Sequence, residues 1–184
     1  MNVYDFDKTI YDGDSAIDFY LFCLKKQPCI IKKFPVQFWN FIRYKAKRID
    51  KISFKEIFYS YFSCVKDIDG IVILFWKKNK NKIKQWYLNQ KKNTDLIISA
   101  SPSFLLEPIC KELNVNLISS VVDKNTGNYI SNNCYGEEKV IRYNEIYKNK
   151  IINNFYSDSK SDLPMAKISK KSYIVKKNKI IEWL

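Results

Sequence analysis

The sequence predicts an α/β fold with a mostly parallel sheet, interrupted by an inserted all-helical segment. Strand and helix patterns alternate over residues 93–184, as they do where crossover helices join parallel strands. Residues 14–92 instead carry helical periodicity throughout, and they separate the first apolar strand from the second. We therefore expect residues 1–13 and 93–184 to form an α/β core domain and residues 14–92 to form a helical cap domain.

The individual elements follow from apolar spacing and from the helix-breaking residues. Residues 1–4 are typical of a short buried strand. Within 14–92, Pro28 and Pro35 break the chain between the first two helices, and one long helix is expected from Ile68 to Tyr87. The later elements are expected as a strand at 95–100, a helix at 103–113, a strand at 116–122, a hairpin around Thr126-Gly127, a helix at 137–148, a strand at 151–156, a short helix near 162–168 and a last strand at 172–176.

The segment Asp5-Phe6-Asp7-Lys8-Thr9 follows the first strand directly. Two carboxylates two positions apart at a strand end raise each other's pKa unless a positive charge lies between them. A hard divalent cation with oxygen ligands is the usual solution. The alternative interpretation is an Asp-rich turn, because Asp and Thr are common in turns.

Three further segments stand where a strand meets a loop. The run from Leu96 ends in Ser99-Ala100-Ser101, Lys139 stands at the start of an amphipathic helix, and the strand at 151–156 leads into Ser157-Asp158-Ser159-Lys160-Ser161-Asp162. Taken singly, Ser99 fits a turn residue, Lys139 a solvated lysine and Asp162 a helix N-cap. Their common order along the chain favours one shared site instead.

In this order the segments DFDKT, IISAS, GEEK and SDSKSD resemble the haloacid dehalogenase (HAD) superfamily, in its phosphoserine-phosphatase-like branch, subfamily IB. The resemblance covers essentially the whole chain. It implies a Rossmann-like three-layer sandwich with a helical cap that closes over the active site and selects the substrate. One departure is Lys8, which stands where many relatives carry Gly or Ser.

The resemblance also implies a role for each matching residue. Asp5 would be the nucleophile and Asp7 the general acid and base. The phosphate-binding residues would be Ser99, the backbone N–H of Ala100, and Lys139, with Thr9 supporting the loop. The Mg²⁺ ligands would be Asp5, Asp7, Asp158 and Asp162, the last acting through water.

The chemistry is consistent with the residue types present. Phosphoryl transfer needs an in-line nucleophile, a cation for the equatorial oxygens and donors for the transferred group. A carboxylate can attack phosphorus and form an aspartyl-phosphate, which water hydrolyses. Asp7 can serve as acid and then base if its neighbour Asp5 raises its pKa. The chain has no histidine, which excludes Ser-His-Asp and Cys-His catalysis.

Composition narrows the class further. The sequence has no run of about 18 or more apolar residues, so no transmembrane helix is expected. The N-terminal residues do not fit the pattern of a signal peptide. The five cysteines form no C-x-x-C pair and stand mostly among apolar residues. We therefore expect a cytoplasmic protein.

Charge is concentrated in the segment 14–92. It holds 18 Lys and Arg residues against 6 Asp and Glu, and 17 of the chain's 29 aromatic residues. A basic segment over an acidic site suits a negatively charged substrate or surface, including a phosphorylated lipid at an anionic membrane, a sugar phosphate or nucleic acid. The alternative is that the aromatic residues form a core and the lysines are solvated. No nucleic-acid-binding motif is present, so we expect a small phosphomonoester, with peripheral contact to an anionic membrane surface as a further expectation.

Residues that would select the substrate are less clearly marked. Asp14 lies seven positions after Asp7, where a Glu of phosphoserine phosphatases helps bind the substrate amine, but it also fits an N-cap for a helix starting at Ser15. Arg43 and Arg48 are candidates for a bidentate grip on a carboxylate or second phosphate, or cover apolar surface with their stems. The predicted function is a Mg²⁺-dependent phosphatase acting on a small phosphometabolite or a phospholipid head-group phosphate. The alternative is a non-enzymatic polyanion or nucleic-acid binder with a relic site.

Overall fold

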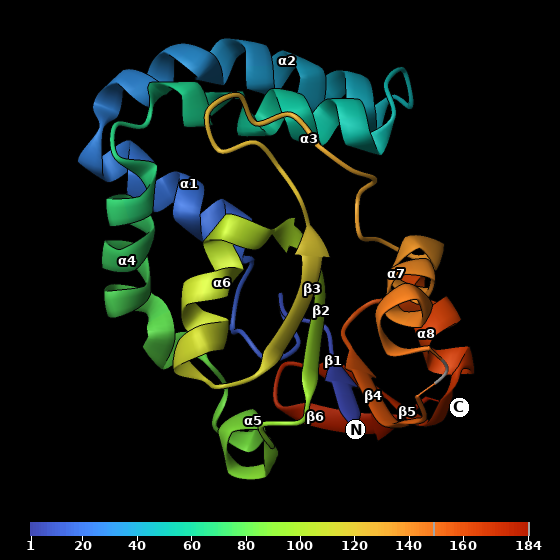
Figure 1. Ribbon diagram of the computed structural model, residues 1–184. Coiled ribbons are helices and arrows are strands. Elements are labelled where there is room, and N and C mark those ends of the chain that lie inside the picture. Colours follow the sequence, from blue (N-terminus) through green and yellow to red (C-terminus); the bar gives the residue numbers. More distant parts are fainter. Residues whose placement is uncertain (149, 184) are drawn as a thin grey trace.

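The protein is described by a computed structural model that covers residues 1–148 and 150–183. A six-stranded sheet with the order β3-β2-β1-β4-β5-β6 lies at its centre (Figure 1). The first five strands pair in parallel, and β6 pairs with β5 in antiparallel fashion. The strands are β1 (Asn2–Tyr4), β2 (Leu96–Pro102), β3 (Asn116–Ser120), β4 (Ile152–Ser157), β5 (Ser169–Lys176) and β6 (Lys179–Glu182).

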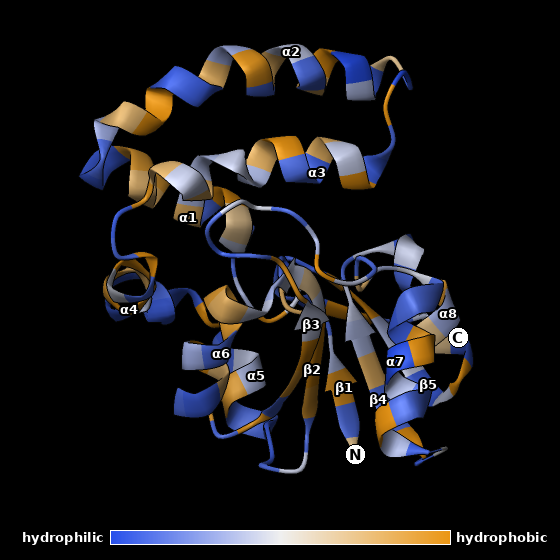
Figure 2. Ribbon diagram, turned by 45° about the horizontal axis from the view of Figure 1, so that its top comes forward, coloured by the Kyte–Doolittle hydropathy of each residue, from blue (hydrophilic) through white to orange (hydrophobic). Residues whose placement is uncertain are grey.

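Helices cover both faces of this sheet, which gives three layers. Figure 2 shows α6 (Ser103–Glu112) on one side and α7 (Glu137–Tyr147) with α8 (Leu163–Lys167) on the other. Successive residues of a strand point to opposite faces of the sheet. Tyr4 and Ile97 therefore belong to one hydrophobic cluster, whereas Val3 belongs to the other. Side chains are buried on both faces at β1 and β2, which explains the unbroken apolar runs Val3-Tyr4 and Leu96-Ile97-Ile98.

The segment between β1 and β2 is helical, as predicted. It holds α1 (Ser15–Lys26), α2 (Phe34–Lys45), α3 (Lys51–Tyr59), α4 (Ile68–Asn79) and α5 (Gln85–Gln90), with 3₁₀ turns at Pro28–Lys33, Ser60–Cys64 and Lys80–Lys82. Figures 1 and 2 show α2 and α3 beside each other beyond the carboxyl ends of the strands.

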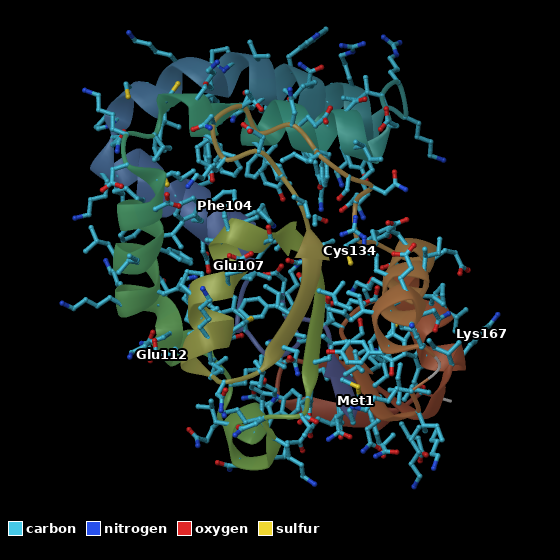
Figure 3. All side chains as sticks on the ribbon, viewed as in Figure 1. Met1, Phe104, Glu107, Glu112, Cys134 and Lys167 are labelled. Carbon is cyan, nitrogen blue, oxygen red and sulfur yellow. The ribbon has the colours of Figure 1, made fainter. Side chains whose placement is uncertain are left out.

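The helical segment and the sheet share one hydrophobic cluster. It runs from Phe19 and Phe75 through to Tyr4 and Ile97. Figure 3 shows Phe104 of α6 near this region, and its ring meets that of Phe62 at 5.2 Å between centroids. The division into a core domain and a cap domain stays a prediction.

The prediction of one long helix from Ile68 to Tyr87 is wrong. Helix α4 ends at Asn79, and Ile83 forms an antiparallel bridge with Tyr11. The backbone N–H of Lys84 donates to Ile10 O at 2.8 Å, so this stretch pairs with the loop after β1. Tertiary pairing outweighs helix propensity here.

Strand β6 was not predicted. All four of its residues are exposed, so they lack the buried alternation that marks a strand. The turn before it holds Lys177 at φ 56°, the left-handed backbone of a tight hairpin. In the described part of the chain, no helix is both long and apolar enough to cross a bilayer.

Candidate active site

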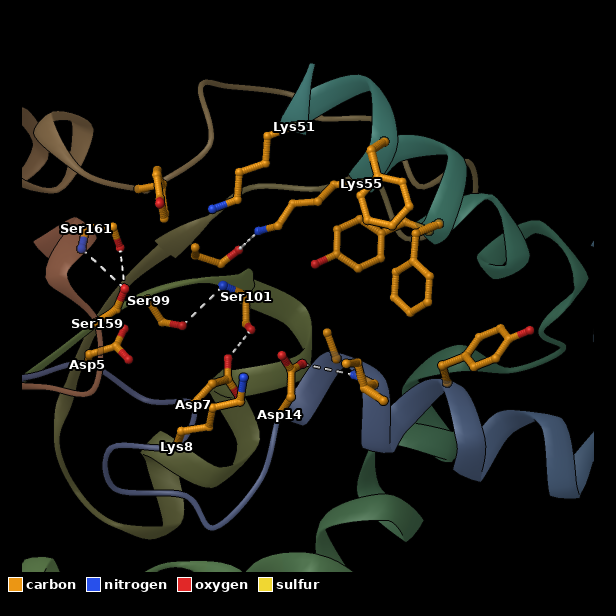
Figure 4. Close-up of a pocket in the computed structure, with 18 of the residues that line it drawn as sticks. Asp5, Asp7, Lys8, Asp14, Lys51, Lys55, Ser99, Ser101, Ser159 and Ser161 are labelled. Carbon is orange, nitrogen blue, oxygen red and sulfur yellow. Dashed lines mark hydrogen bonds between the residues drawn. The ribbon is translucent and has the colours of Figure 1, made fainter. Parts of the chain in front are cut away.

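The carboxyl ends of β1, β2 and β4 surround one cavity of about 650 Å³ (Figure 4). Parallel strands place the loops that follow them at one edge of a sheet, which is where α/β folds gather functional groups. Apart from the two candidate arginines, all but one of the predicted site residues line this cavity, namely Asp5, Asp7, Asp14, Ser99, Ala100, Lys139, Asp158 and Asp162. The remaining one, Thr9, is buried beside Asp5.

Lys139 lies buried between two carboxylates. Its Nζ donates to Asp5 Oδ1 at 2.7 Å and to Asp162 Oδ2 at 2.8 Å. Burial raises the pKa of Asp5 to about 7, against the lowering effect of Lys139. Burial would lower the pKa of Lys139, but Asp5 and Asp162 hold it above its ordinary value. Lys139 therefore stays charged in a site of low dielectric.

Thr9 joins the first and last motifs. Its hydroxyl donates to Asp5 Oδ2 at 3.2 Å and accepts from the backbone N–H of Asp158 at 2.9 Å. The backbone N–H of Asp5 in turn donates to Tyr156 O at 2.9 Å. These contacts fix the nucleophile candidate against the loop that carries Asp158.

Asp7 is held by two donors from other segments. Ser101 Oγ donates to its Oδ2 at 2.5 Å, and the backbone N–H of Ser15 donates to its Oδ1 at 2.6 Å. The pKa of Asp7 is raised to about 6, as predicted in direction, but the cause differs from the one expected. Burial comes first and the charge of Asp14 second, while the serine hydrogen bonds lower the pKa.

The end of β2 supplies hydroxyl groups next to Asp7. Ser99 is buried, and its Oγ accepts from the backbone N–H of Ser101 at 3.1 Å. Ala100 lines the cavity, and its carbonyl accepts from Lys55 Nζ at 3.0 Å. Phosphate binding by Ser99 and by the Ala100 N–H stays a prediction.

The predicted metal ligands share the cavity but are not gathered around one point. Within residues 1–148 and 150–183, no three His, Cys, Asp or Glu side chains lie close enough to hold one ion. Two observations nevertheless fit a hard cation here. Asp162 Oδ1 is buried without a hydrogen-bond partner, and burial together with Asp162 raises the pKa of Asp158. Carboxylate oxygens are the donors that Mg²⁺ prefers.

Asp14 is the N-cap of α1. It has extended backbone, and its Oδ1 accepts from the backbone N–H of Ile17 at 3.1 Å. It also lines the cavity, so contact with a substrate stays a prediction beside the capping role.

The departure at Lys8 has a backbone consequence. This residue has φ 58°, in the left-handed region that glycine adopts at lower cost. Its side chain is exposed at the edge of the cavity.

Sequence reasoning missed three residues at this site. They are Ser101, which donates to Asp7, and Lys51 and Lys55, which extend from α3 into the cavity (Figure 4). The sequence signal was the spacing of Lys51 and Lys55, which matches that of Phe54 and Phe58 and so places all four on one helix face.

The two arginines named as candidates are not at the site. Neither Arg43 nor Arg48 is among the described residues that line the cavity. Arg43 Nη1 instead donates to Asn40 Oδ1 at 3.0 Å on its own helix.

Several solved structures have a fold similar to that of this chain. A protein of unknown function from Bordetella pertussis Tohama I matches with TM-score 0.76 and 17% identity, over 94% of this chain and 87% of that one. A phosphoserine phosphohydrolase-like protein from Francisella tularensis subsp. tularensis SCHU S4 matches with TM-score 0.54 and 16% identity, over 94% and 86%. A HAD family hydrolase from Salmonella enterica subsp. enterica serovar Typhi matches with TM-score 0.56 and 12% identity, over 91% and 59%.

The curated proteins gave no significant match. The haloacid dehalogenase-like hydrolase family, however, matches residues 3–167, a span that contains all four motifs and the helical segment. The α/β fold, the parallel sheet and the placement of the motifs at one cavity agree with this match. The chain is therefore an enzyme that belongs to the haloacid dehalogenase-like hydrolase family.

Proposed function

We propose that this hydrolase is a phosphatase that cleaves a phosphomonoester through an aspartyl-phosphate on Asp5. The observation that carries the proposal is the buried Asp5–Lys139–Asp162 arrangement at the floor of the cavity. Burial raises the pKa of Asp5, but Lys139 lowers it and holds its Oδ1, which favours the carboxylate form that attacks phosphorus.

Two half-reactions follow from these groups. Asp5 attacks phosphorus and forms a bond to its carboxylate oxygen, while the bond from phosphorus to the alcohol oxygen breaks. Protonated Asp7, with its pKa raised to about 6, gives its proton to the leaving alcohol oxygen. Water then attacks the phosphorus, Asp7 takes a proton from it, and Asp5 is released as carboxylate.

Mg²⁺ is the proposed cofactor, and Asp5, Asp7, Asp158 and Asp162 would hold it. When bound, it would supply positive charge to the phosphate oxygens. Lys139 adds a second positive charge from the protein, and the serines at the end of β2 provide hydroxyl donors.

A turnover assay tests the proposal. Wild-type protein should release phosphate from a small aryl phosphate when Mg²⁺ is present and stop when EDTA is added. Asp5→Asn should lower the rate by at least about a thousandfold, the size reported for loss of a key catalytic group. Asp12→Asn is the matched control, because Asp12 is an exposed carboxylate outside the cavity.

The outcomes separate the two functions considered. Activity that survives Asp5→Asn would remove Asp5 as nucleophile. Wild-type protein that leaves every phosphomonoester intact would favour the relic-site alternative.

We also propose a reducing, cytoplasmic location, supported by five cysteines that are all free thiols in the structure.

Peripheral contact with an anionic membrane is proposed as well. Helix α2 exposes Val36, Trp39 and Ile42, with Lys32 and Lys33 before it and Lys45 at its end. Co-sedimentation with phosphatidylserine vesicles at low salt, and loss of binding at high salt, would support this contact. Equal pelleting with and without vesicles would end it.

A further inference from the structure

The cavity has two chemically different ends. At the floor lie the carboxylates, Lys139 and the serines of β2. Away from it the cavity runs between α1, α2 and α3, where the wall is mainly apolar. Five phenylalanines of α2 and α3 line this part, namely Phe34, Phe38, Phe41, Phe54 and Phe58. The polar groups of Tyr20 and Gln37 in the same wall are hydrogen-bonded to each other at 3.0 Å.

Helix α3 lies at the boundary between the polar floor of the cavity and its apolar part. Lys51 and Lys55 form one row along the helix, and Phe54 and Phe58 form the adjacent row. Lys55 Nζ reaches the end of β2, where it donates to Ala100 O at 3.0 Å and to Asn133 Oδ1 at 3.3 Å (Figure 4). The lysine row therefore faces the predicted phosphate-binding segment, and the phenylalanine row faces the apolar part.

The rings of α2 surround open space rather than closing into a core. Phe34, Phe38 and Phe41 line the cavity and are still 48%, 53% and 42% exposed. Phe34 and Phe38 stack at 5.8 Å between ring centroids, and Phe41 lies 6.0 Å from Phe54. Aromatic surface left open beside a polar site is typical of a binding pocket for a partly apolar ligand.

The charge of the helical segment lies mostly outside this cavity. Of the 18 basic residues in 14–92, all of which the structure describes, only Lys51 and Lys55 line it. They stand beside the site where the transferred phosphate would lie. A second charged or strongly polar group on the alcohol would meet phenylalanine rings, where it loses water without gaining hydrogen bonds.

We propose that the substrate is an amphiphilic phosphomonoester, with its phosphate at Asp5 and a linear apolar chain among the five phenylalanines. The proposal rests on the proposed function, because it names the substrate class of the same site. Burial of methylene groups supplies binding that a small polar phosphometabolite does not have.

A chain-length series tests this proposal. Phosphate release would be measured with Mg²⁺ on ethyl, butyl, hexyl, octyl and decyl phosphate, each below its micelle-forming concentration. We expect kcat/KM to rise about three- to fourfold for each methylene that enters the apolar part, until the cavity is filled. A flat series would overturn the proposal.

A matched pair of variants ties the effect to the cavity. Phe38→Ser should lower kcat/KM for decyl phosphate roughly five- to tenfold and leave ethyl phosphate within about twofold. Trp39→Ser is the control, because Trp39 lies next along α2, is 61% exposed and does not line the cavity. Equal losses in both variants would mean that the chain binds elsewhere on α2.

Calorimetry with alkylphosphonates separates this proposal from the proposed function, because their carbon–phosphorus bond is not hydrolysed. Affinity for wild-type protein that rises with chain length and falls in Phe38→Ser supports the apolar subsite even if no ester is turned over. Turnover of aryl phosphate together with chain-independent affinity would leave the phosphatase standing and remove the amphiphilic substrate.

Discussion

At the level of single residues, Lys139 lies between two buried carboxylates and donates to both, at 2.7 Å and 2.8 Å. Such an arrangement contributes little net stability when intact, since desolvation offsets attraction, but it is costly to break. In the proposed function it keeps a positive charge where the phosphate oxygens would lie. The same residue therefore links the stability of the apoprotein to the proposed chemistry.

Replacing Lys139 by Met should destabilise the metal-free protein by about 3–5 kcal/mol at about pH 8, and by less at about pH 5. The folded pKa of Asp5 is raised from 3.8 to about 7, so its contribution to stability is present at low pH and is lost as pH rises through about 7. Without Lys139 that pKa rises further, and the loss with pH grows. Urea unfolding in EDTA measures both values.

The control is Lys160→Met, at an exposed lysine that begins the 3₁₀ turn Lys160–Asp162 after β4. It should change the free energy of unfolding by less than about 0.5 kcal/mol at either pH. An effect of Lys139→Met that does not depend on pH would contradict the ionic role assigned to this lysine.

Individual site residues were predictable to different degrees. Asp5, Asp7 and Lys139 stand where strands meet loops or a helix begins, so their spacing placed them at one cavity. The hydrogen bond from Ser101 to Asp7 was not predictable, because strand periodicity does not say which hydroxyl reaches which carboxylate. The order of causes behind the Asp7 pKa also depends on burial and on Asp14, which only the folded chain reveals.

Among the elements, α3 and the hairpin loop after β3 depend on each other. The backbone N–H of Tyr129 donates to Glu56 Oε1 at 3.0 Å, and the Tyr129 ring lies 6.4 Å from that of Tyr59. At the turn of this loop, Gly127 has φ +85°, and a Cβ there would lie 2.5 Å from backbone atoms of Tyr59. Glycine thus permits the contact that seats α3, the helix that carries Lys51 and Lys55.

Gly127→Ala should therefore destabilise the protein by roughly 2–4 kcal/mol, because left-handed backbone strain adds to a clash that backbone atoms cannot relieve. Gly136→Ala is a matched comparison. Gly136 has φ +59°, but its added Cβ would come no closer than 3.7 Å to Ser161 O. We expect it to cost less than Gly127→Ala, about 1–2 kcal/mol, because only the backbone strain remains. Equal losses in urea unfolding would show that the Tyr59 contact can yield.

Elements were predicted well where one surface is buried. The helices of 14–92 and the strands β1, β2 and β4 have apolar patterns set by burial. The break between α4 and α5 was missed because Ile83, Trp86 and Tyr87 continue the helical spacing although Ile83 pairs with Tyr11. Strand β6 was missed because its side chains face solvent and only its backbone pairs with β5.

Across the whole molecule, segments far apart in sequence converge at one edge of the sheet. The contact from Asp158 to Thr9 joins residues 149 positions apart, and that from Lys139 to Asp5 joins residues 134 apart. Three carboxylates of this edge have raised pKa values, chiefly through burial. The apoprotein therefore carries an electrostatic cost that a cation in the cavity would relieve.

Mg²⁺ should accordingly raise the melting temperature of the wild-type protein. A ligand that binds only the folded state adds about 2.7 kcal/mol at a hundredfold excess over its Kd, which is roughly 5–10 °C for a chain of this size. Asp158→Asn should lose most of this shift. Because that change removes a carboxylate whose pKa burial already raises, the variant should melt no lower than wild type in EDTA. Asp12→Asn, at an exposed carboxylate outside the cavity, should keep the full shift. A shift of equal size in all three proteins would place Mg²⁺ away from Asp158, and no shift in wild type would remove Mg²⁺ as the resident cation.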